Sequence, residues 1–368
     1  MGSKRDRSPC NYVSDLDTDD GGNSQYRLKK KQVVPAIFKD NCMTVCGKVK
    51  AQRLVLKEHE RRSSRPPNLT CRIESFTRIC QTFDERTTKW VKEMGFGGLL
   101  HLPSDLQLPR KLNYWLLSRV DPISQKLIGS DGKEFKFSNN QVHRVLGIPN
   151  GGLPVPTKKS LSTEMRAKTY EILGKYGKTW EGKSRNFLGR TYTSTGIPIN
   201  SSMMDRLEDY WEAHDKEEFK TLFLLIILQM LLCPTQSPRL AADLVPALTC
   251  ASDCQNFDWC ELVMGRLMQS VVSFARAFYA SGFAKGCGGC TIFLVIFYLD
   301  RLNRDPVSWG SFPRIKVWNM QHIRGAAKED KITATGDFGH LGMLDVAYGE
   351  QHLDMARDSN GPVDTARL

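Results

Sequence analysis

The sequence contains no apolar run long enough to cross a bilayer. Its longest run, FLLIILQMLL from Phe223 to Leu232, has ten residues, whereas a membrane-spanning helix needs about 20. No apolar stretch follows the polar start MGSKRDRSPC, and Asp6 stands where an N-myristoylation signal needs Ser or Thr. We therefore expect an intracellular chain without a membrane partner, in which Phe223–Leu232 forms a buried helix.

Cysteines are present, but not in the pairs that metal and redox sites use. Among the 11 Cys residues, only Cys287 and Cys290 form a CxxC, while Cys250, Cys254 and Cys260 lie within eleven residues of one another. A structural zinc site needs a second close pair of ligands. A thioredoxin-like CxxC opens a helix after a strand, whereas this one precedes an apolar run. We therefore expect reduced thiols, no metal and no cofactor.

The sequence also lacks the motifs of sequence-specific nucleic-acid readers, such as zinc-finger spacing or aromatics interleaved with Gly. It nevertheless has 52 Lys and Arg against 40 Asp and Glu, a net charge of +12. This balance favours acidic partners, although solubility alone explains it equally well. RLKKK, with Arg27, Lys29, Lys30 and Lys31, is a candidate nuclear import signal or non-specific nucleic-acid contact. The alternative is a solvated run of charge.

The composition divides the chain into three parts. Residues 1–68 are polar and rich in Gly, Ser and Asp, so we predict a disordered basic leader. Residues 69–325 have globular composition and helical periodicity, which predicts a mainly α-helical domain with one small β-hairpin. Residues 326–368 lose this periodicity and are predicted to form a loosely ordered tail, with Met343–Val346 docked on the domain.

Apolar residues at helical spacing predict the positions of several helices. The segment CTIFLVIFYLDRL is apolar on all sides, as a central helix is, although its β-branched residues leave a strand possible. The other predicted helices contain Ile73, Phe76, Ile79 and Cys80 on one face, TTKWVKEMG ending at Gly95, LPRKLNYWLLSRVDP with Leu112, Trp115, Leu116 and Arg119 on one face, and Trp259 to Phe274 after a cap at Asp258.

The stretch KFSNNQVHRVLGIPNGG predicts a hairpin strand followed by a short, firmly bounded helix. Asp131-Gly132 upstream is a hairpin turn signal, after which Phe135 and Phe137 alternate with lysines. Ser138 and Gln141 have capping-box spacing, and Gly147 ends the helix. The apolar face is Val142, Val145 and Leu146, with Arg144 pointing away and His143 a packing or surface residue. This pattern indicates scaffold geometry and not chemistry.

Several of these motifs carry a family resemblance. MGFGGLLHL, LPRKLNYWLLSRVDP, LIGSDGKEFKFSNNQVHRVLGIPNGG, IFLVIFYLDRL and SFPRIKVWN follow one another between about Glu93 and Asn319. In order and spacing they resemble uncharacterised proteins of grass genomes and the aminotransferase-like plant mobile domain. The resemblance implies a transposon-related, mainly α-helical module without established catalytic activity. In some relatives a cysteine protease domain that cleaves ubiquitin-like modifiers such as SUMO follows it.

One motif suggests an enzyme instead. GKTWEGKS matches the phosphate-binding loop, with Gly177 and Gly182 as its glycines, Lys183 reaching the terminal phosphates, Ser184 on Mg²⁺, and Asp300 as an acidic residue after an apolar run. A P-loop follows a buried strand and opens a helix, but the preceding TEMRAKTYEILGKY has a helical pattern and the following RNFLGRTYTSTGIP is a poor helix. A P-loop NTPase is therefore the alternative.

The chain also holds residue types that a cysteine protease uses. The nearest imitation is Cys254, with His214 and Asp215 upstream. On a helix, neighbouring side chains diverge by about 100°, so we predict that His214 and Asp215 cannot easily form the hydrogen bond that orients a catalytic His. Cys254 lacks a following Gly, and 114 residues remain after it, too few for such a domain. The chain could then be the non-catalytic N-terminal part of a ubiquitin-like-specific protease.

Together these observations predict a function without predicting a catalytic residue. We expect a non-catalytic helical interaction or assembly module that acts in the nucleus, or otherwise in the cytoplasm, on an unidentified protein partner. Non-specific contact with nucleic acid is expected through the leader.

Overall fold

The computed structural model describes residues 69–158, 161–183, 191–281, 288–350 and 356–358. The predicted leader with Arg27 and Lys29–Lys31, the candidate Mg²⁺ ligand Ser184, and Cys287 of the CxxC lie outside these residues. The helices are α2 (Ile73–Gln81), α3 (Glu85–Glu93), η2 (Gly97–His101), α4 (Arg110–Leu117), α5 (Asn139–Leu146), α6 (Thr163–Tyr176), α7 (Ser201–Glu208), η3 (Ala213–Asp215), α8 (Lys216–Ile227), η4 (Leu228–Leu232), η5 (Val245–Asn256), α9 (Trp259–Ser281), α10 (Thr291–Asp300), η6 (Arg314–Lys316) and α11 (Met320–Glu329). The strands are β1 (Val120–Asp121), β2 (Lys126–Ile128), β3 (Glu134–Lys136), β4 (Leu153–Pro154), β5 (Lys178–Lys183), β6 (Thr191–Pro198), β7 (Arg239–Leu240) and β8 (Phe257–Asp258).

Two all-apolar helices form the centre of the core. The predicted buried helix is α8, which continues as the π-helical turn η4 and buries every residue from Leu222 to Leu232. The segment that could have been a strand is the helix α10, and all ten of its residues are buried. A helix that is apolar all round has no face to give to water, which is why both lie inside. Among the described residues, no helix is long and apolar enough to cross a membrane.

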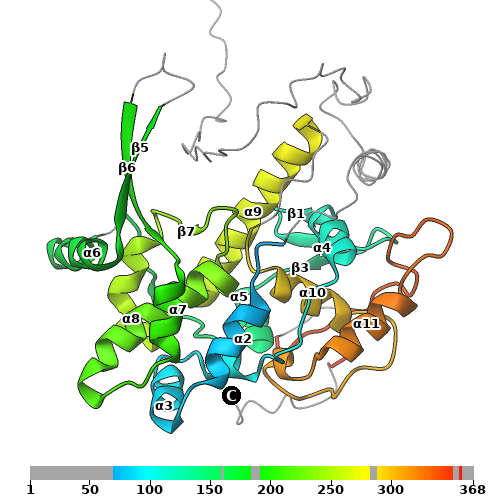
Figure 1. Cartoon of the computed structure of the whole chain (residues 1–368). Coiled ribbons are helices and arrows are strands. Elements are labelled where there is room, and N and C mark those ends of the chain that lie inside the picture. The colour runs from blue at the N-terminus through cyan, green and yellow to red at the C-terminus, as the bar shows by residue number, and fades with distance from the viewer. Residues whose placement is uncertain (1–68, 159–160, 184–190, 282–287, 351–355, 359–368) are drawn as a thin grey trace, which may run out of the picture.

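Amphipathic helices cover this centre, as their periodicity predicted. α2 buries Ile73, Phe76 and Ile79, α4 buries its whole apolar face, and α9 begins next to its predicted cap. That cap is confirmed, because Asp258 accepts a hydrogen bond of 2.8 Å from the backbone N–H of Glu261. Each such face buries apolar surface, which stabilises the fold by about 25 cal/mol per Å². α10 and α11 lie on one side of the molecule and α6 on the other (Figure 1).

The hairpin and the short helix after it are confirmed. β2 and β3 pair antiparallel, and Gly132 in their turn has a φ of +84°. The capping box of α5 is complete, with Ser138 accepting from Gln141 N–H and Gln141 accepting from Ser138 N–H. Gly147 ends α5 at a φ of +65°, and a Cβ there would lie 2.9 Å from the Cα of Gly98. Glycine is thus required both by backbone conformation and by close approach.

Arg144 does not point away from the core as predicted. Its side chain is buried, and its guanidinium lies 5.3 Å from the centre of the Phe312 ring. Burial lowers the pKa of this guanidinium. The helical period had placed Arg144 opposite the apolar face of α5, but η6 covers that side. His143 is half-buried, with Nδ1 2.7 Å from the carbonyl oxygen of Ile148.

The prediction of a mainly α-helical domain with one small hairpin is wrong. The described residues contain three small sheets, ordered β1-β2-β3, β4-β8 and β5-β6-β7. In the longest pairing, β5 runs antiparallel to β6 from Lys178 opposite Gly196 to Lys183 opposite Thr191. The remaining strands have two or three residues and several join distant segments, as in the parallel pair β4-β8. Such short strands form only when the packed core brings them together, and therefore have no local pattern.

The predicted boundary at residue 325 falls inside α11. Beyond this helix the chain is held against the core, with Val346 and Tyr348 fully buried and an isolated bridge between Leu302 and Met343. Asp330 anchors the turn by accepting hydrogen bonds from the N–H groups of Gly339, at 2.8 Å, and Leu341, at 3.0 Å. The docking expected for Met343–Val346 is therefore part of a longer packed segment, built from polar contacts that apolar periodicity does not report.

Candidate binding groove

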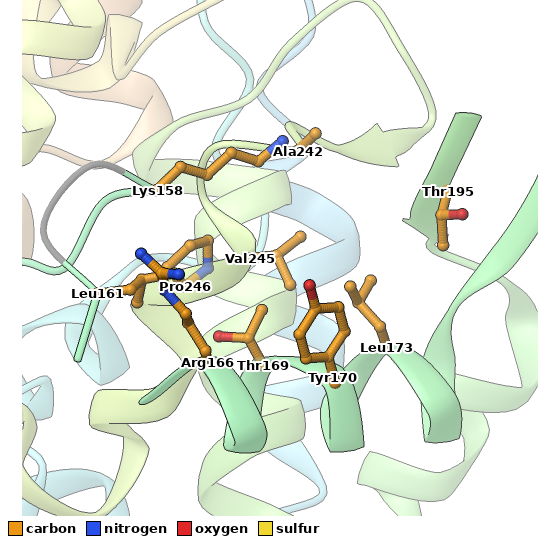
Figure 2. A pocket seen from close by; sticks show the side chains of 10 residues that line it. All are labelled: Lys158, Leu161, Arg166, Thr169, Tyr170, Leu173, Thr195, Ala242, Val245 and Pro246. Carbon is orange, nitrogen blue, oxygen red and sulfur yellow. The ribbon is translucent and has the colours of Figure 1, made fainter. Parts of the chain in front are cut away.

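A cavity lined by ten residues lies between α6 and η5. Its volume is about 400 Å³. Figure 2 shows Lys158 running along one rim towards Ala242, while Arg166 and Tyr170 rise from α6 on the other side. Residues of both walls and of β6 line it, namely Lys158, Leu161, Arg166, Thr169, Tyr170, Leu173, Thr195, Ala242, Val245 and Pro246. We call this cavity and its rim the α6–η5 groove.

Helical spacing explains how α6 builds one wall. Ser162 caps the helix by accepting from the backbone N–H of Met165 at 3.2 Å. Arg166, Thr169, Tyr170 and Leu173 follow at i, i+3, i+4 and i+7, so they share one side of the helix. The hydroxyl of Thr169 donates to the carbonyl oxygen of Met165 at 2.7 Å and is thereby satisfied. Only Thr169 of α6 is buried, so the helix presents most of its surface to solvent.

The charges of α6 separate by face. Glu164, Lys168, Glu171 and Lys175 lie at i, i+4, i+7 and i+11, on the side away from the groove. They alternate in sign, and Lys168 lies 4.0 Å from Glu164 while Lys175 lies 3.0 Å from Glu218. The charges on this outer face of α6 therefore cancel. The groove face of α6 carries the cation Arg166 and no acidic residue.

Two cations and one aromatic ring of the groove are open to solvent. Lys158 and Arg166 are exposed, and neither has an ion pair with a carboxylate of the described residues. Tyr170 is 74% exposed, which is unusual for so large an apolar side chain. The opposite wall is apolar, because Val245 and Pro246 of η5 are buried. The groove therefore offers positive charge and an aromatic face beside an apolar wall.

The groove lies in one of two strongly basic parts of the chain. Residues 158–190 contain nine Lys and Arg against three Glu, a net charge of +6. Residues 1–68 contain fifteen Lys and Arg against eight Asp and Glu, a net charge of +7. All other residues together have a net charge of −1, so these two segments account for the whole excess of +12. Sequence reasoning missed Lys158, Arg166 and Tyr170, although this local charge density was a usable signal.

The β5–β6 hairpin stands next to the groove (Figure 1). Trp180 of β5 packs under the guanidinium of Arg239, whose carbon lies 3.6 Å from the ring centre. Across the strands the hydroxyls of Thr179 and Thr195 lie 3.2 Å apart. β7 pairs with the end of β6, from Ile197 opposite Leu240. These contacts fix the base of the hairpin, which carries Thr195 to the groove.

The phosphate-loop residues do not have the geometry of a nucleotide site. Gly177 ends the helix α6, while Gly182 and Lys183 pair with Tyr192 and Thr191 inside a hairpin. A P-loop instead wraps phosphates between a strand and the helix that follows. Asp300 is the last residue of the helix α10, in a different part of the molecule from β5 (Figure 1). The structure therefore does not bring Lys183 and Asp300 together.

Asp300 is the centre of a buried polar cluster. Arg314 donates to it from Nη2 at 2.8 Å and from Nε at 3.1 Å. Trp318 donates from its indole nitrogen at 2.9 Å, and the hydroxyl of Tyr348 also donates to the carboxylate. Burial opposes the charge of Arg314, but the carboxylate outweighs it and the pKa of this guanidinium is raised. Burial and the charge of Asp300 raise the pKa of Tyr348.

A family model matches the part of the chain that contains the groove. A model of the family "Domain of unknown function (DUF8566)" matches residues 69–295, more than half of the chain. The chain belongs to this family. Searches of curated proteins and of solved structures each found no match. The region shared with DUF8566 contains both walls of the groove, α6 and η5, but it ends inside α10 and before Arg314, Trp318 and Tyr348.

The clustered cysteines that the structure describes in this DUF8566 member are buried, whereas Cys71 and Cys80 are half-buried. Cys250, Cys254, Cys260 and Cys290 are unpaired and buried, and burial raises the pKa of Cys250 and of Cys290 to about 12. Such thiols are poor nucleophiles because little thiolate forms. Among the described residues, no group of three or more His, Cys, Asp and Glu is arranged to hold a metal ion.

His214 and Asp215 lie close together, but among the described residues no hydrogen bond joins their side chains. The Nε2 of His214 lies 3.3 Å from Oδ1 of Asp215, because the turn η3 is a 3-10 helix in which Asp215 folds back to accept from the backbone N–H of Glu212 at 3.3 Å. The pair does not resemble a catalytic dyad with Cys254. His214 is largely exposed, whereas Cys254 is buried and donates to the carbonyl oxygen of Ala251.

Proposed function

We propose that this DUF8566 member is a non-catalytic interaction module that binds an acidic partner through the α6–η5 groove. The observation that carries the proposal is the pair Lys158 and Arg166, two exposed cations without a carboxylate partner in the described residues, beside the exposed ring of Tyr170. Clefts lined by one sign of charge concentrate ligands of the opposite sign. A small apolar wall with a few polar groups is the usual composition of a binding site.

The resemblance to the plant mobile domain supports the same class of function. It implies a transposon-related helical module without established catalysis, which agrees with a binding function.

We also propose a nuclear location, on the basis of RLKKK with Arg27 and Lys29–Lys31. Cytoplasmic fluorescence of a fusion that carries residues 1–68 would contradict that location.

A capture experiment tests the proposal. The full chain is compared with the double variant Lys158→Gln and Arg166→Gln as bait, with and without nuclease. The matched control is Arg324→Gln and Lys328→Gln, which removes one Arg and one Lys, both exposed, from α11 on the other side of the molecule. We expect the groove variant to lose a set of partners that the control retains. Equal capture by both variants would overturn the proposal.

A further inference from the structure

We infer that the acidic ligand of the α6–η5 groove is single-stranded nucleic acid, held by Lys158 and Arg166 through phosphates and by Tyr170 through a base. This inference rests on the proposed function and names the partner of the same site. It concerns the folded domain and is separate from any contact that the basic residues 1–68 make.

The phosphate contacts follow from charge and position. Lys158 lies on one rim and Arg166 on the other, so a backbone that crosses the groove meets a cation on each side (Figure 2). An Arg guanidinium can hold a phosphate with two parallel hydrogen bonds, and a Lys ammonium acts as a point charge. Lys178, exposed at the start of β5, continues the positive surface beyond α6.

The base contact follows from the exposure of Tyr170. Proteins that bind single strands combine a positive groove with aromatic rings on which bases stack. Tyr170 is 74% exposed and projects from α6 towards Val245, so its ring is open to a planar ligand inside the groove (Figure 2). Leu173 and the buried Pro246 provide apolar surface next to that position. Mutual burial of a base and these side chains removes apolar area from water.

Two features favour this ligand over an acidic protein and over a duplex. Nucleic acid carries one negative charge at every nucleotide, which suits the net charge of +6 over residues 158–190. In a protein segment the carboxylates are scattered among neutral residues. In a duplex the bases are already stacked on one another, so the ring of Tyr170 could not reach a base face inside a concave site.

Fluorescence anisotropy of the full chain with labelled single strands of about 20 nucleotides tests the inference. Tyr170→Ala should weaken binding by about 5- to 150-fold, the loss of one stacked base, whereas Tyr170→Phe keeps the ring and should stay within about twofold. Lys158→Gln with Arg166→Gln should lower the slope of log K against log salt by about 1.4, two contacts at about 0.7 each. The matched α11 pair should leave the slope unchanged, because α11 lies on the other side of the molecule from the groove. Any contribution of residues 1–68 to the slope is the same in all variants.

The outcomes separate this inference from the proposed function. Equal binding by wild type and Tyr170→Ala would overturn the inference, as would duplex DNA that binds as tightly and depends equally on Tyr170. Competition by poly-L-glutamate at equal charge would also overturn it, in favour of an acidic protein, while the proposed function would stand. If the groove variant neither loses captured partners nor changes its salt slope, the inference and the proposed function are both contradicted. Thermal melts of each variant establish that it is folded.

Discussion

The Asp300 cluster and the α6–η5 groove use the same residue types in opposite ways. In the cluster, Asp300 and Arg314 are buried and fully engaged, with Arg314 also donating to the carbonyl oxygens of Val307 and Ser308 at 2.8 and 2.9 Å. In the groove, Lys158 and Arg166 are exposed, with no carboxylate partner in the described part of the chain. A buried charge without a partner costs several kcal/mol, whereas an exposed one costs little.

This difference indicates which charges serve the fold and which are open to a ligand. The cluster has no donor or acceptor to offer, because Tyr348 and Trp318 occupy the positions around the carboxylate that Arg314 leaves. The exposed side chains of Lys158 and Arg166 contribute almost nothing to packing. If substitution of Lys158 or Arg166 unfolded the domain, or if substitution of Asp300 left its stability unchanged, this difference between the two regions would not hold.

The largest effect is expected for Asp300→Ala. The change leaves the guanidinium of Arg314 buried without its counter-charge, which should lower the free energy of unfolding by about 3–5 kcal/mol. Urea denaturation measures it. The control Asp105→Ala removes an exposed aspartate from a loop and should stay within about 0.5 kcal/mol of the wild type. Equal stability of the two variants would show that the cluster does not hold the fold.

Tyr348→Phe should have the next largest effect. It removes a hydroxyl that donates to the carboxylate of Asp300 without changing the ring. Hydrogen bonds to charged groups contribute about 1.5–3 kcal/mol, so the free energy of unfolding should fall by this amount. Tyr170→Phe is the matched control, since its ring lies in solvent. A similar loss at both positions would mean that the hydroxyl of Tyr348 is not special.

Ser138→Ala should cost about 1 kcal/mol, the usual value of an N-cap. The hydroxyl of Ser138 accepts from Gln141 N–H and also donates to Glu350, so it joins the start of α5 to the C-terminal segment. Ser273→Ala, on the exposed face of α9, should be neutral in the same urea titration. A cost no larger than that of the control would contradict a stabilising role of the capping box.

The smallest effect on stability is expected in the groove itself. Lys158→Gln combined with Arg166→Gln should change the free energy of unfolding by no more than about 0.5 kcal/mol, because neither side chain supports packing. Calorimetric melting of the double variant measures this. A loss of 2 kcal/mol or more, on the order of a core substitution, would place these cations with Asp300 and Arg314 among the residues that hold the fold.

Sequence reasoning succeeded where a feature is local and failed where it depends on distant partners. The capping box of α5 and the all-apolar helices α8 and α10 were predictable, since caps and periodicity need only neighbouring residues. The pair β4-β8 joins residues about one hundred positions apart and has no local signature. The burial of Arg144 failed for the same reason, because Phe312 covers it from another part of the chain.

The candidate site was not predictable from motifs. GKTWEGKS has the letters of a P-loop, but spacing alone does not specify a strand, a turn and a helix in that order. The groove residues Lys158, Arg166 and Tyr170 form no known motif. What unites them is that α6 turns one side towards η5, and this arrangement follows from tertiary packing.

The boundary of the DUF8566 match divides a helix that the fold needs whole. The match ends at residue 295, halfway along α10, whose last residue Asp300 gathers its polar partners from Arg314 onwards. A polypeptide cut at that boundary would keep only the first half of α10, a helix that has no polar side. It would lose Asp300 together with Arg314, Trp318 and Tyr348, which surround its carboxylate. The region that matches the family model is thus smaller than the packed unit of this chain.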